Sequence, residues 1–217
     1  MSRKTILSCI SITLALIVCG LYLAIRSASP LAIDSAAHLY LSEYIRSDFL
    51  TSVMLGLSYL VSPYTVIFIL GILYCFVPQK QVSYCVIFAL AGSTLLNLII
   101  KNIVQRPRPS TLHLMIEHGY SFPSGHAMAA MALLGIFVWL IFSLKTAEDN
   151  SIFSHTKQIM ISSIFILLIL AIGVSRIYLG VHYASDVIAG YSCSLLWLIG
   201  YTQLIVPKLF PELTSSK

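Results

Sequence analysis

Long apolar stretches alternate with short polar loops along the whole chain. Six of these stretches reach or approach the roughly 20 residues that a helix needs to cross the hydrocarbon core of a bilayer. The pattern predicts membrane-spanning helices over about 5–25, 50–77, 82–104, 125–144, 157–175 and 186–206. The second stretch is over-long and contains Ser62-Pro63, so we expect it to kink there or to begin as a short interfacial helix.

The segment between the first two spans has a helical repeat of apolar and polar positions. One face holds Ile33, Ala37, Tyr40, Leu41 and Tyr44, and another holds Asp34, His38, Ser42 and Arg46. This pattern predicts an amphipathic helix that lies in the membrane interface. An ordinary surface helix packed on the bundle is an equally good interpretation.

The composition supports an integral membrane protein. With 58% hydrophobic and 10% charged residues, the chain has too little polar surface to cover a water-soluble globule. Because a backbone exposed to lipid must pair its own polar groups, we expect an all-α helical bundle. No repeat or linker divides residues 1–217, so a single domain is expected. The apolar stretch of the first span exceeds the usual 7 to 15 residues of a signal peptide, which favours an uncleaved anchor.

The net positive charge of the chain does not indicate a nucleic-acid partner. The net charge is +5, but the basic residues are scattered through short loops and form no stripe interleaved with aromatic residues. The five cysteines fall inside apolar runs without CxxC spacing, so they are interpreted as small buried apolar residues.

The distribution of lysine and arginine predicts the orientation. With a cytoplasmic N-terminus, seven basic residues fall on the inner side: Arg3, Lys4, Lys80, Lys145, Lys157, Lys208 and Lys217. Six fall on the outer side: Arg26, Arg46, Lys101, Arg106, Arg108 and Arg176. Three of the outer six, Lys101, Arg108 and Arg176, belong to polar clusters with a chemical function. Without them, seven basic residues remain on the inner side and three on the outer side. The positive-inside rule then favours both termini in the cytoplasm of a cell (inner) membrane protein.

Three polar clusters fall on the outer side, at the edges of spans. They are residues 101–110 after the third span, 121–126 before the fourth, and 175–186 between the fifth and sixth. Ionisable groups at the edge of the hydrocarbon are costly, so three clusters at one membrane depth indicate a functional site.

Each cluster has a plain structural interpretation as well as a chemical one. His182 and Asp186 are four apart on one helical face, where the carboxylate can fix the imidazole tautomer and prepare a nucleophile. The aspartate could equally be a helix cap. Ser124-Gly125-His126 opens a helix whose free N–H groups favour an anion, or it is only a helix start. Lys101 could bind that anion or simply snorkel.

Together the clusters favour phosphate chemistry. Lys101, Arg108 and Arg176 supply three cations that could neutralise the charge on phosphate oxygens. One histidine can attack phosphorus while the other protonates a departing alkoxide. A two-metal phosphatase would need more oxygen ligands than the outer loops offer, so we expect a reaction without metal or other cofactor.

At these residues the chain resembles the type 2 phosphatidic acid phosphatases, a family related to vanadium haloperoxidases and bacterial acid phosphatases. The three motifs of that family stand here as Lys101 with Arg108-Pro109, as Pro123-Ser124-Gly125-His126, and as Ser175-Arg176 with His182 and Asp186. Arg106-Pro107 is out of register with the first motif and receives no family role. The motifs cover about residues 100 to 190, and the six-span layout matches by analogy.

The resemblance implies a role for each matching residue. His182 would become transiently phosphorylated, Asp186 would orient it, and His126 would protonate the leaving group. The phosphate would be held by a further set of side chains and backbone: Lys101, Arg108, Ser124, Gly125 and Arg176. Ser121, Phe122 and His113 receive no role, and neither does His118, although the last two could contact substrate.

The resulting hypothesis is a lipid phosphatase that removes a terminal phosphate at the extracytoplasmic membrane surface. A polyprenyl diphosphate such as undecaprenyl diphosphate is favoured by analogy. Phosphatidic acid, phosphatidylglycerol phosphate and a lipid A phosphate also fit. A lipid phosphotransferase would use the same residues. A non-catalytic lipid-binding protein or transporter is the alternative from another class. Oligomeric state is left open.

Overall fold

The computed structural model describes residues 2–110, 113–144 and 153–214, and the regular elements in these ranges are all helical. Lys145 and Lys217, which enter the charge count above, lie outside the described residues. The α-helices are α1 (Arg3–Ser27), α2 (Ala32–His38), α3 (Asp48–Tyr59), α4 (Pro63–Phe76), α5 (Lys80–Val104), α6 (Gly125–Ser143), α7 (His155–Tyr178), α8 (Ala184–Gly200) and α9 (Val206–Leu209). Short π-helical or 3₁₀ segments complete them: Leu39–Tyr44, Tyr201–Ile205 and Pro211–Leu213.

A helix or a bent pair of helices occupies each of the six predicted ranges. Within the described ranges, five helical segments are long and apolar enough to cross a membrane. The second predicted span is instead divided into α3 and α4, which are bent by 50° relative to each other. Ser62 caps α4 by accepting a hydrogen bond from the N–H of Thr65, and Pro63 is its first residue, so the predicted break is confirmed. At about 21 Å, α4 alone is too short to cross a bilayer.

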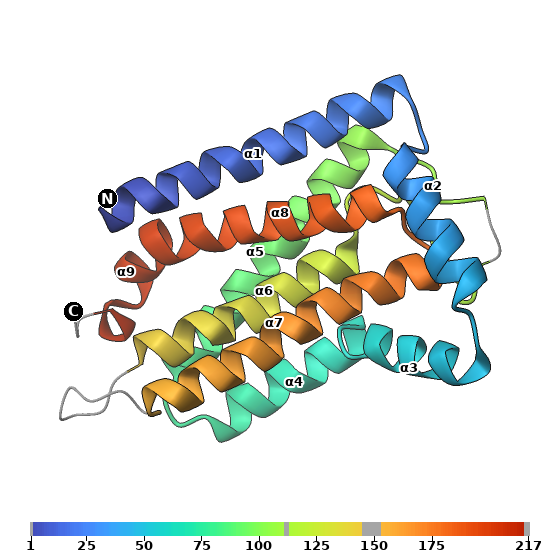
Figure 1. Ribbon diagram of the computed structural model, residues 1–217. Coiled ribbons are helices and arrows are strands. Elements are labelled where there is room, and N and C mark those ends of the chain that lie inside the picture. Colours follow the sequence, from blue (N-terminus) through green and yellow to red (C-terminus); the bar gives the residue numbers. More distant parts are fainter. Residues whose placement is uncertain (1, 111–112, 145–152, 215–217) are drawn as a thin grey trace.

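Helix α6 lies at the centre of the bundle and packs against α5, α7 and α8, while α1 lies on the outer side of α8 (Figure 1). The core between these helices contains fully buried aliphatic side chains such as Val86, Leu133 and Ile136. Gly190 allows α8 to approach the start of α6 closely. A Cβ there would lie 2.8 Å from the carbonyl oxygen of Ser124, so this position requires glycine.

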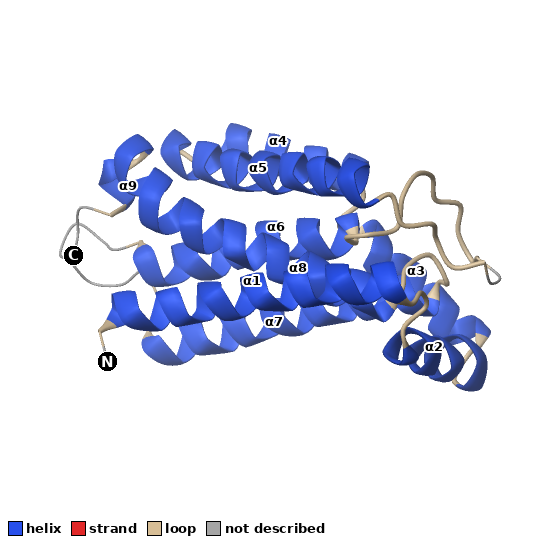
Figure 2. Ribbon diagram, turned by 90° about the horizontal axis from the view of Figure 1, so that it is seen from above, coloured by secondary structure: helices blue, strands red, loops and turns tan. Residues whose placement is uncertain are grey.

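The loops that connect the helices lie at the two ends of the bundle. Both termini lie at one end, and the loop from α5 to α6 lies at the other, near α2 and α3 (Figures 1 and 2). This arrangement follows from an even number of crossings, and it brings the three predicted polar clusters to one end of the molecule.

The segment before α3 differs from the prediction in which face it turns to the bundle. Asp34 was expected on the polar, outward face of an amphipathic helix, but its carboxylate is buried with 1% exposure. Ala37 and Leu41 pack beside it against α7 and α8, whereas Tyr40 and Tyr44 are exposed. The reason is that Asp34 has ionic and hydrogen-bonding partners inside the bundle, described below.

Candidate active site

Several of the residues that the sequence predicts for the site lie at the ends of helices. Lys101 is in the last turn of α5 and Arg176 is in the last turn of α7. His126 is in the first turn of α6, and Asp186 is in the first turn of α8. The backbone N–H of Ser124 donates to the carbonyl of Asp186 at 3.0 Å, which ties the starts of α6 and α8 together.

His182 and Asp186 form a buried pair. The imidazole Nδ1 lies 3.5 Å from Oδ2 of the carboxylate, slightly longer than an ordinary hydrogen bond and close enough to tighten into one. Burial lowers the pKa of His182 to about 3, although the neighbouring carboxylate acts in the opposite direction. The imidazole is therefore neutral at ordinary pH and keeps a lone pair.

The other ring nitrogen of His182 faces a cation. Its Nε2 lies 3.2 Å from a terminal nitrogen of Arg108. If Nδ1 carries the proton for Asp186, Nε2 is the acceptor, and its lone pair points toward the guanidinium. Backbone carbonyls of Gly119, His118 and Val181 hold that guanidinium in place. The nucleophile candidate and a phosphate-binding candidate are thus in contact.

These groups open into a polar cavity of about 420 Å³. Five of the eight predicted site residues line it: Lys101, Arg108, Gly125, His126 and His182. His118 lines it too and is exposed, whereas His113 is exposed and lies outside the lining. A pocket with two cations and two imidazoles suits an anion with several oxygens.

The remaining three predicted residues are buried behind this lining. Asp186 supports His182, as described. The hydroxyl oxygen of Ser124 accepts a hydrogen bond from the N–H of Ala127 at 3.4 Å, so Ser124 caps α6. Arg176 is fully buried, and its Nε has no hydrogen-bond partner among the described residues.

The carboxylate of Glu117 lies close to several basic residues of the site, a role that its position in the sequence did not indicate. It pairs with the guanidinium of Arg176 and lies 3.6 Å from Arg108 and 4.0 Å from Nδ1 of His126. Burial would raise the pKa of Glu117, but Arg176, followed by His126 and Arg108, outweighs this and lowers it. The ionised carboxylate is placed to stabilise a protonated His126.

Two more side chains that sequence reasoning left without a role contact Asp186. Ser121 donates its hydroxyl to Asp186, and Arg106 forms ion pairs with both Asp186 and Asp34. The motifs gave Arg106 no family role, but the structure buries its guanidinium between these two carboxylates. The doubled Arg-Pro at Arg106 and Arg108 was the only signal in the sequence for it.

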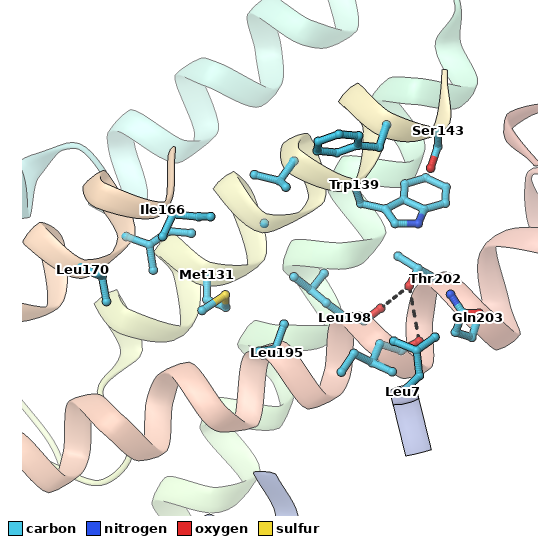
Figure 3. A pocket seen from close by; sticks show the side chains of 15 residues that line it. Leu7, Met131, Trp139, Ser143, Ile166, Leu170, Leu195, Leu198, Thr202 and Gln203 are labelled. Atoms are coloured by element: carbon cyan, nitrogen blue, oxygen red, sulfur yellow. Dashed lines mark hydrogen bonds between the residues drawn. The ribbon is translucent and has the colours of Figure 1, made fainter. Parts of the chain in front are cut away.

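A larger cavity of about 610 Å³ lies elsewhere, between α1, α6, α7 and α8 (Figure 3). Its lining is almost entirely apolar, with Met131, Trp139 and Leu198 among its residues. The hydroxyl of Thr202, which also lines the cavity, donates a hydrogen bond to the carbonyl oxygen of Leu198 at 2.8 Å. The cavity has no titratable group of the kind that phosphate chemistry needs, so the smaller polar cavity is the candidate active site.

Comparisons with known proteins show the family of the chain. A family model described as the PAP2 superfamily matches residues 82–209. Phosphatidylglycerophosphatase B of Bacillus subtilis is 32% identical over 176 residues, which cover 80% of this chain and 81% of that protein. Human dolichyldiphosphatase 1 is 28% identical over 130 residues, which cover 55% of this chain and 52% of the relative. The chain therefore spans about half the length of this second relative.

Solved structures give the same result. The transmembrane PAP2-type phosphatidylglycerolphosphate phosphatase from Bacillus subtilis superposes with a TM-score of 0.77 at 26% identity, covering 92% of this chain and 98% of that one. LpxE from Aquifex aeolicus gives a TM-score of 0.58 at 26% identity, covering 78% and 96%.

Fold, site and relatives together define a class of protein, the membrane-embedded lipid phosphatases. The chain belongs to the PAP2 superfamily.

Proposed function

We propose that the protein hydrolyses the terminal phosphate of a lipid phosphate or diphosphate through a phosphohistidine formed on His182. The observation that carries this proposal is that the polar cavity adjoins an apolar one. The second cavity, of about 340 Å³, lies between α4, α5 and α6 and shares Asn97, Gly125 and His126 with the first. A phosphate group at His182 can therefore be continuous with a hydrocarbon tail.

The lining of the second cavity supports a lipid tail as its occupant. Its lining includes the apolar side chains of Val61, Val66 and Leu90. It adjoins the break between α3 and α4, where a bent span leaves room beside α5. A water-soluble phosphate ester would gain nothing from this surface, whereas a lipid tail would bury apolar area there.

The first chemical step transfers the phosphoryl group to the protein. As the Arg108 guanidinium turns from Nε2 of His182 to a phosphate oxygen, the lone pair on Nε2 forms a bond to phosphorus, and the bond from phosphorus to the leaving oxygen breaks. His126 gives its proton to that oxygen, and Asp186 stabilises the positive charge on the phosphorylated imidazole. Lys101, Arg108 and Arg176 neutralise the charge on the other phosphate oxygens.

The second step returns the protein to its starting state. Water attacks phosphorus, the phosphorus–nitrogen bond breaks, and His182 leaves as a neutral imidazole. His126, which lost its proton in the first step, accepts one from the water. We propose that no metal ion takes part, because cationic side chains occupy the places where metal ions would neutralise phosphate.

A polyprenyl diphosphate remains the favoured substrate. The dolichyldiphosphatases among the relatives carry names that denote this class, while the phosphatidylglycerophosphatase relative has a name that denotes another. We expect purified protein in detergent with EDTA to release phosphate fastest from undecaprenyl diphosphate. The comparison lipids are phosphatidic acid, phosphatidylglycerol phosphate and a lipid A phosphate, at equal mole fraction.

Each outcome of that assay is informative. Faster release from one of the other three lipids would replace the favoured substrate without removing the phosphatase activity. Loss of activity in EDTA that added metal restores would contradict metal independence. Transfer of labelled phosphate to a second lipid instead of water would make the protein a phosphotransferase, and no release or transfer from any lipid would favour a non-catalytic lipid-binding protein.

We also propose that the site faces the extracytoplasmic side of the cell membrane, with both termini in the cytoplasm. The charge count that supports this is the excess of lysine and arginine on the side of the termini. A green fluorescent protein fused after Lys217 should fluoresce, because it folds in the cytoplasm, and an alkaline phosphatase fused there should be inactive. The reverse pattern would invert the proposed orientation.

A further inference from the structure

A buried cluster of charges lies next to Asp186 and outside the residues that line the cavity. Its three members are Asp34 on α2, Arg106 in the loop after α5, and Asp186 on α8. Their exposed fractions are 1%, 4% and 0%. Charged groups are this deeply buried only when they are paired, and segments far apart in the chain supply the partners here.

All the N–H groups of Arg106 find acceptors. One terminal nitrogen donates to Oδ1 of Asp186 at 2.6 Å and to the hydroxyl of Ser185 at 2.7 Å. The other donates to Oδ2 of Asp34 at 2.7 Å and to the hydroxyl of Ser29 at 3.0 Å. Nε also donates to Ser29 at 3.2 Å. The guanidinium therefore has one fixed orientation.

The two oxygens of Asp186 have different partners. Oδ1 accepts from Arg106, whereas Oδ2 faces Nδ1 of His182 and also accepts from the Ser121 hydroxyl and from the backbone N–H of Tyr183, the latter at 2.9 Å. The Arg106 guanidinium additionally stacks on the Tyr183 ring, with 4.0 Å between its central carbon and the ring centroid. Because Arg106 holds one oxygen, the other is presented to the imidazole.

Asp34 balances the charge of Arg106. A lone arginine beside Asp186 would cancel much of the negative charge that the carboxylate offers to His182. With Asp34 on its other side, the guanidinium is already neutralised, and the cluster of three keeps a net charge of −1. That remaining charge is available to the imidazolium that forms when His182 attacks phosphorus.

Asp34 is itself held rigidly. Its Oδ1 accepts from the backbone N–H of Ser185 at 2.8 Å, and its Oδ2 accepts from the Ser185 hydroxyl at 2.9 Å and from the N–H of Leu31 at 3.1 Å. Helix α2 is therefore fastened to the start of α8, one residue before Asp186. The position of α2 is linked to the position of the catalytic carboxylate.

We propose that Arg106 and Asp34 are positioning residues for the reaction. Arg106 orients Asp186 toward His182, and Asp34 keeps Arg106 from neutralising that carboxylate. The inference rests on the proposed role of His182 as the nucleophile. It is distinct from a contribution to folding alone, because it predicts a change in kcat that depends on the presence of the Asp186 carboxylate.

Asp34→Asn tests this most directly, since it removes one charge and keeps the shape of the side chain. We expect kcat for phosphate release to fall about tenfold while KM stays within about twofold, because the phosphate-binding groups are untouched. In the Asp186→Asn background, Asp34→Asn should cause no further loss. A residue that acts through Asp186 has nothing left to act on once that carboxylate is gone.

Glu43→Gln is the matched control, because it removes the same charge from an exposed position in the segment that follows α2. Its kcat should equal that of the unaltered protein. If Asp34→Asn does not give folded, monodisperse protein, Ser185→Ala serves in the same two backgrounds, since it removes one hydroxyl of the network and keeps all three charges. We expect a smaller loss of kcat from it, again absent when Asp186 is Asn.

Three results would overturn the positioning role: an unchanged kcat, a change confined to KM, or an equal proportional loss with and without Asp186. The proposed function fails separately. If His182→Ala retains activity, the nucleophile is wrong whatever Asp34→Asn does. If His182→Ala is inactive while Asp34→Asn is fully active, only the positioning role is lost.

Discussion

Replacement of His182 by alanine is expected to lower phosphate release about 10⁴-fold or more, because no covalent intermediate can form without the imidazole. The residue is 3% exposed, and its ring nitrogens face Asp186, Ser121 and Arg108. The measurement is phosphate release from a dispersed lipid substrate. A second measurement is acid quenching during turnover of ³²P-labelled substrate, which should trap an acid-labile phosphoprotein only when His182 is present.

His113→Ala provides the control for this substitution. His113 is in the loop between α5 and α6, where it is exposed, is absent from the cavity lining and has its Nε2 2.7 Å from the carbonyl oxygen of Pro109. Its loss should leave both phosphate release and trapping unchanged. Equal release by His182→Ala and the unaltered protein would remove His182 as the nucleophile and leave the family resemblance without its proposed mechanism.

The fold was predictable because membrane crossing leaves few choices. Apolar stretches of about 20 residues must be helices, and the order of crossings decides which loops share an end. The motif at Ser124-Gly125-His126 and the pair His182 and Asp186 flank helix starts, so their convergence followed from the span count. The bend between α3 and α4 followed from Ser62-Pro63, which caps one helix and begins the next.

The ion network could not be predicted in the same way. The partners of Arg106 are 72 and 80 residues away along the chain, and no helical periodicity relates them. Asp34 occupies a position that repeats with polar residues, so the pattern indicated a solvent-facing side chain. Only the packing of α2 on the end of α8 shows that this face turns inward. A buried carboxylate with a distant cation looks, in sequence, like a surface charge.

Glu117 illustrates a second limit. Within its loop it is a single acid without helical neighbours, and nothing in the sequence relates it to Arg176 or His126. The structure places its carboxylate between them, where it neutralises one and can stabilise the protonated form of the other. It follows that the acid in the proposed reaction is a pair, with His126 carrying the proton and Glu117 supporting its charge.

His126→Ala should therefore affect substrates according to their leaving group. With a lipid alkyl phosphate, whose alkoxide departs poorly without a proton, we expect kcat/KM to fall about 10³-fold. With p-nitrophenyl phosphate, whose leaving group is stable as an anion, the loss should be less than about tenfold. The measurement is the ratio of the two losses, obtained with one preparation of each variant.

Lys101→Ala gives the contrast that makes this ratio interpretable. Lys101 lines the same cavity at the end of α5, yet its proposed role is to hold phosphate oxygens that both substrates share. Its loss should lower kcat/KM for both by a similar factor, since the interaction does not depend on the leaving group. If His126→Ala also lowers both equally, His126 holds phosphate as Lys101 does, and the proton for the leaving oxygen comes from another group.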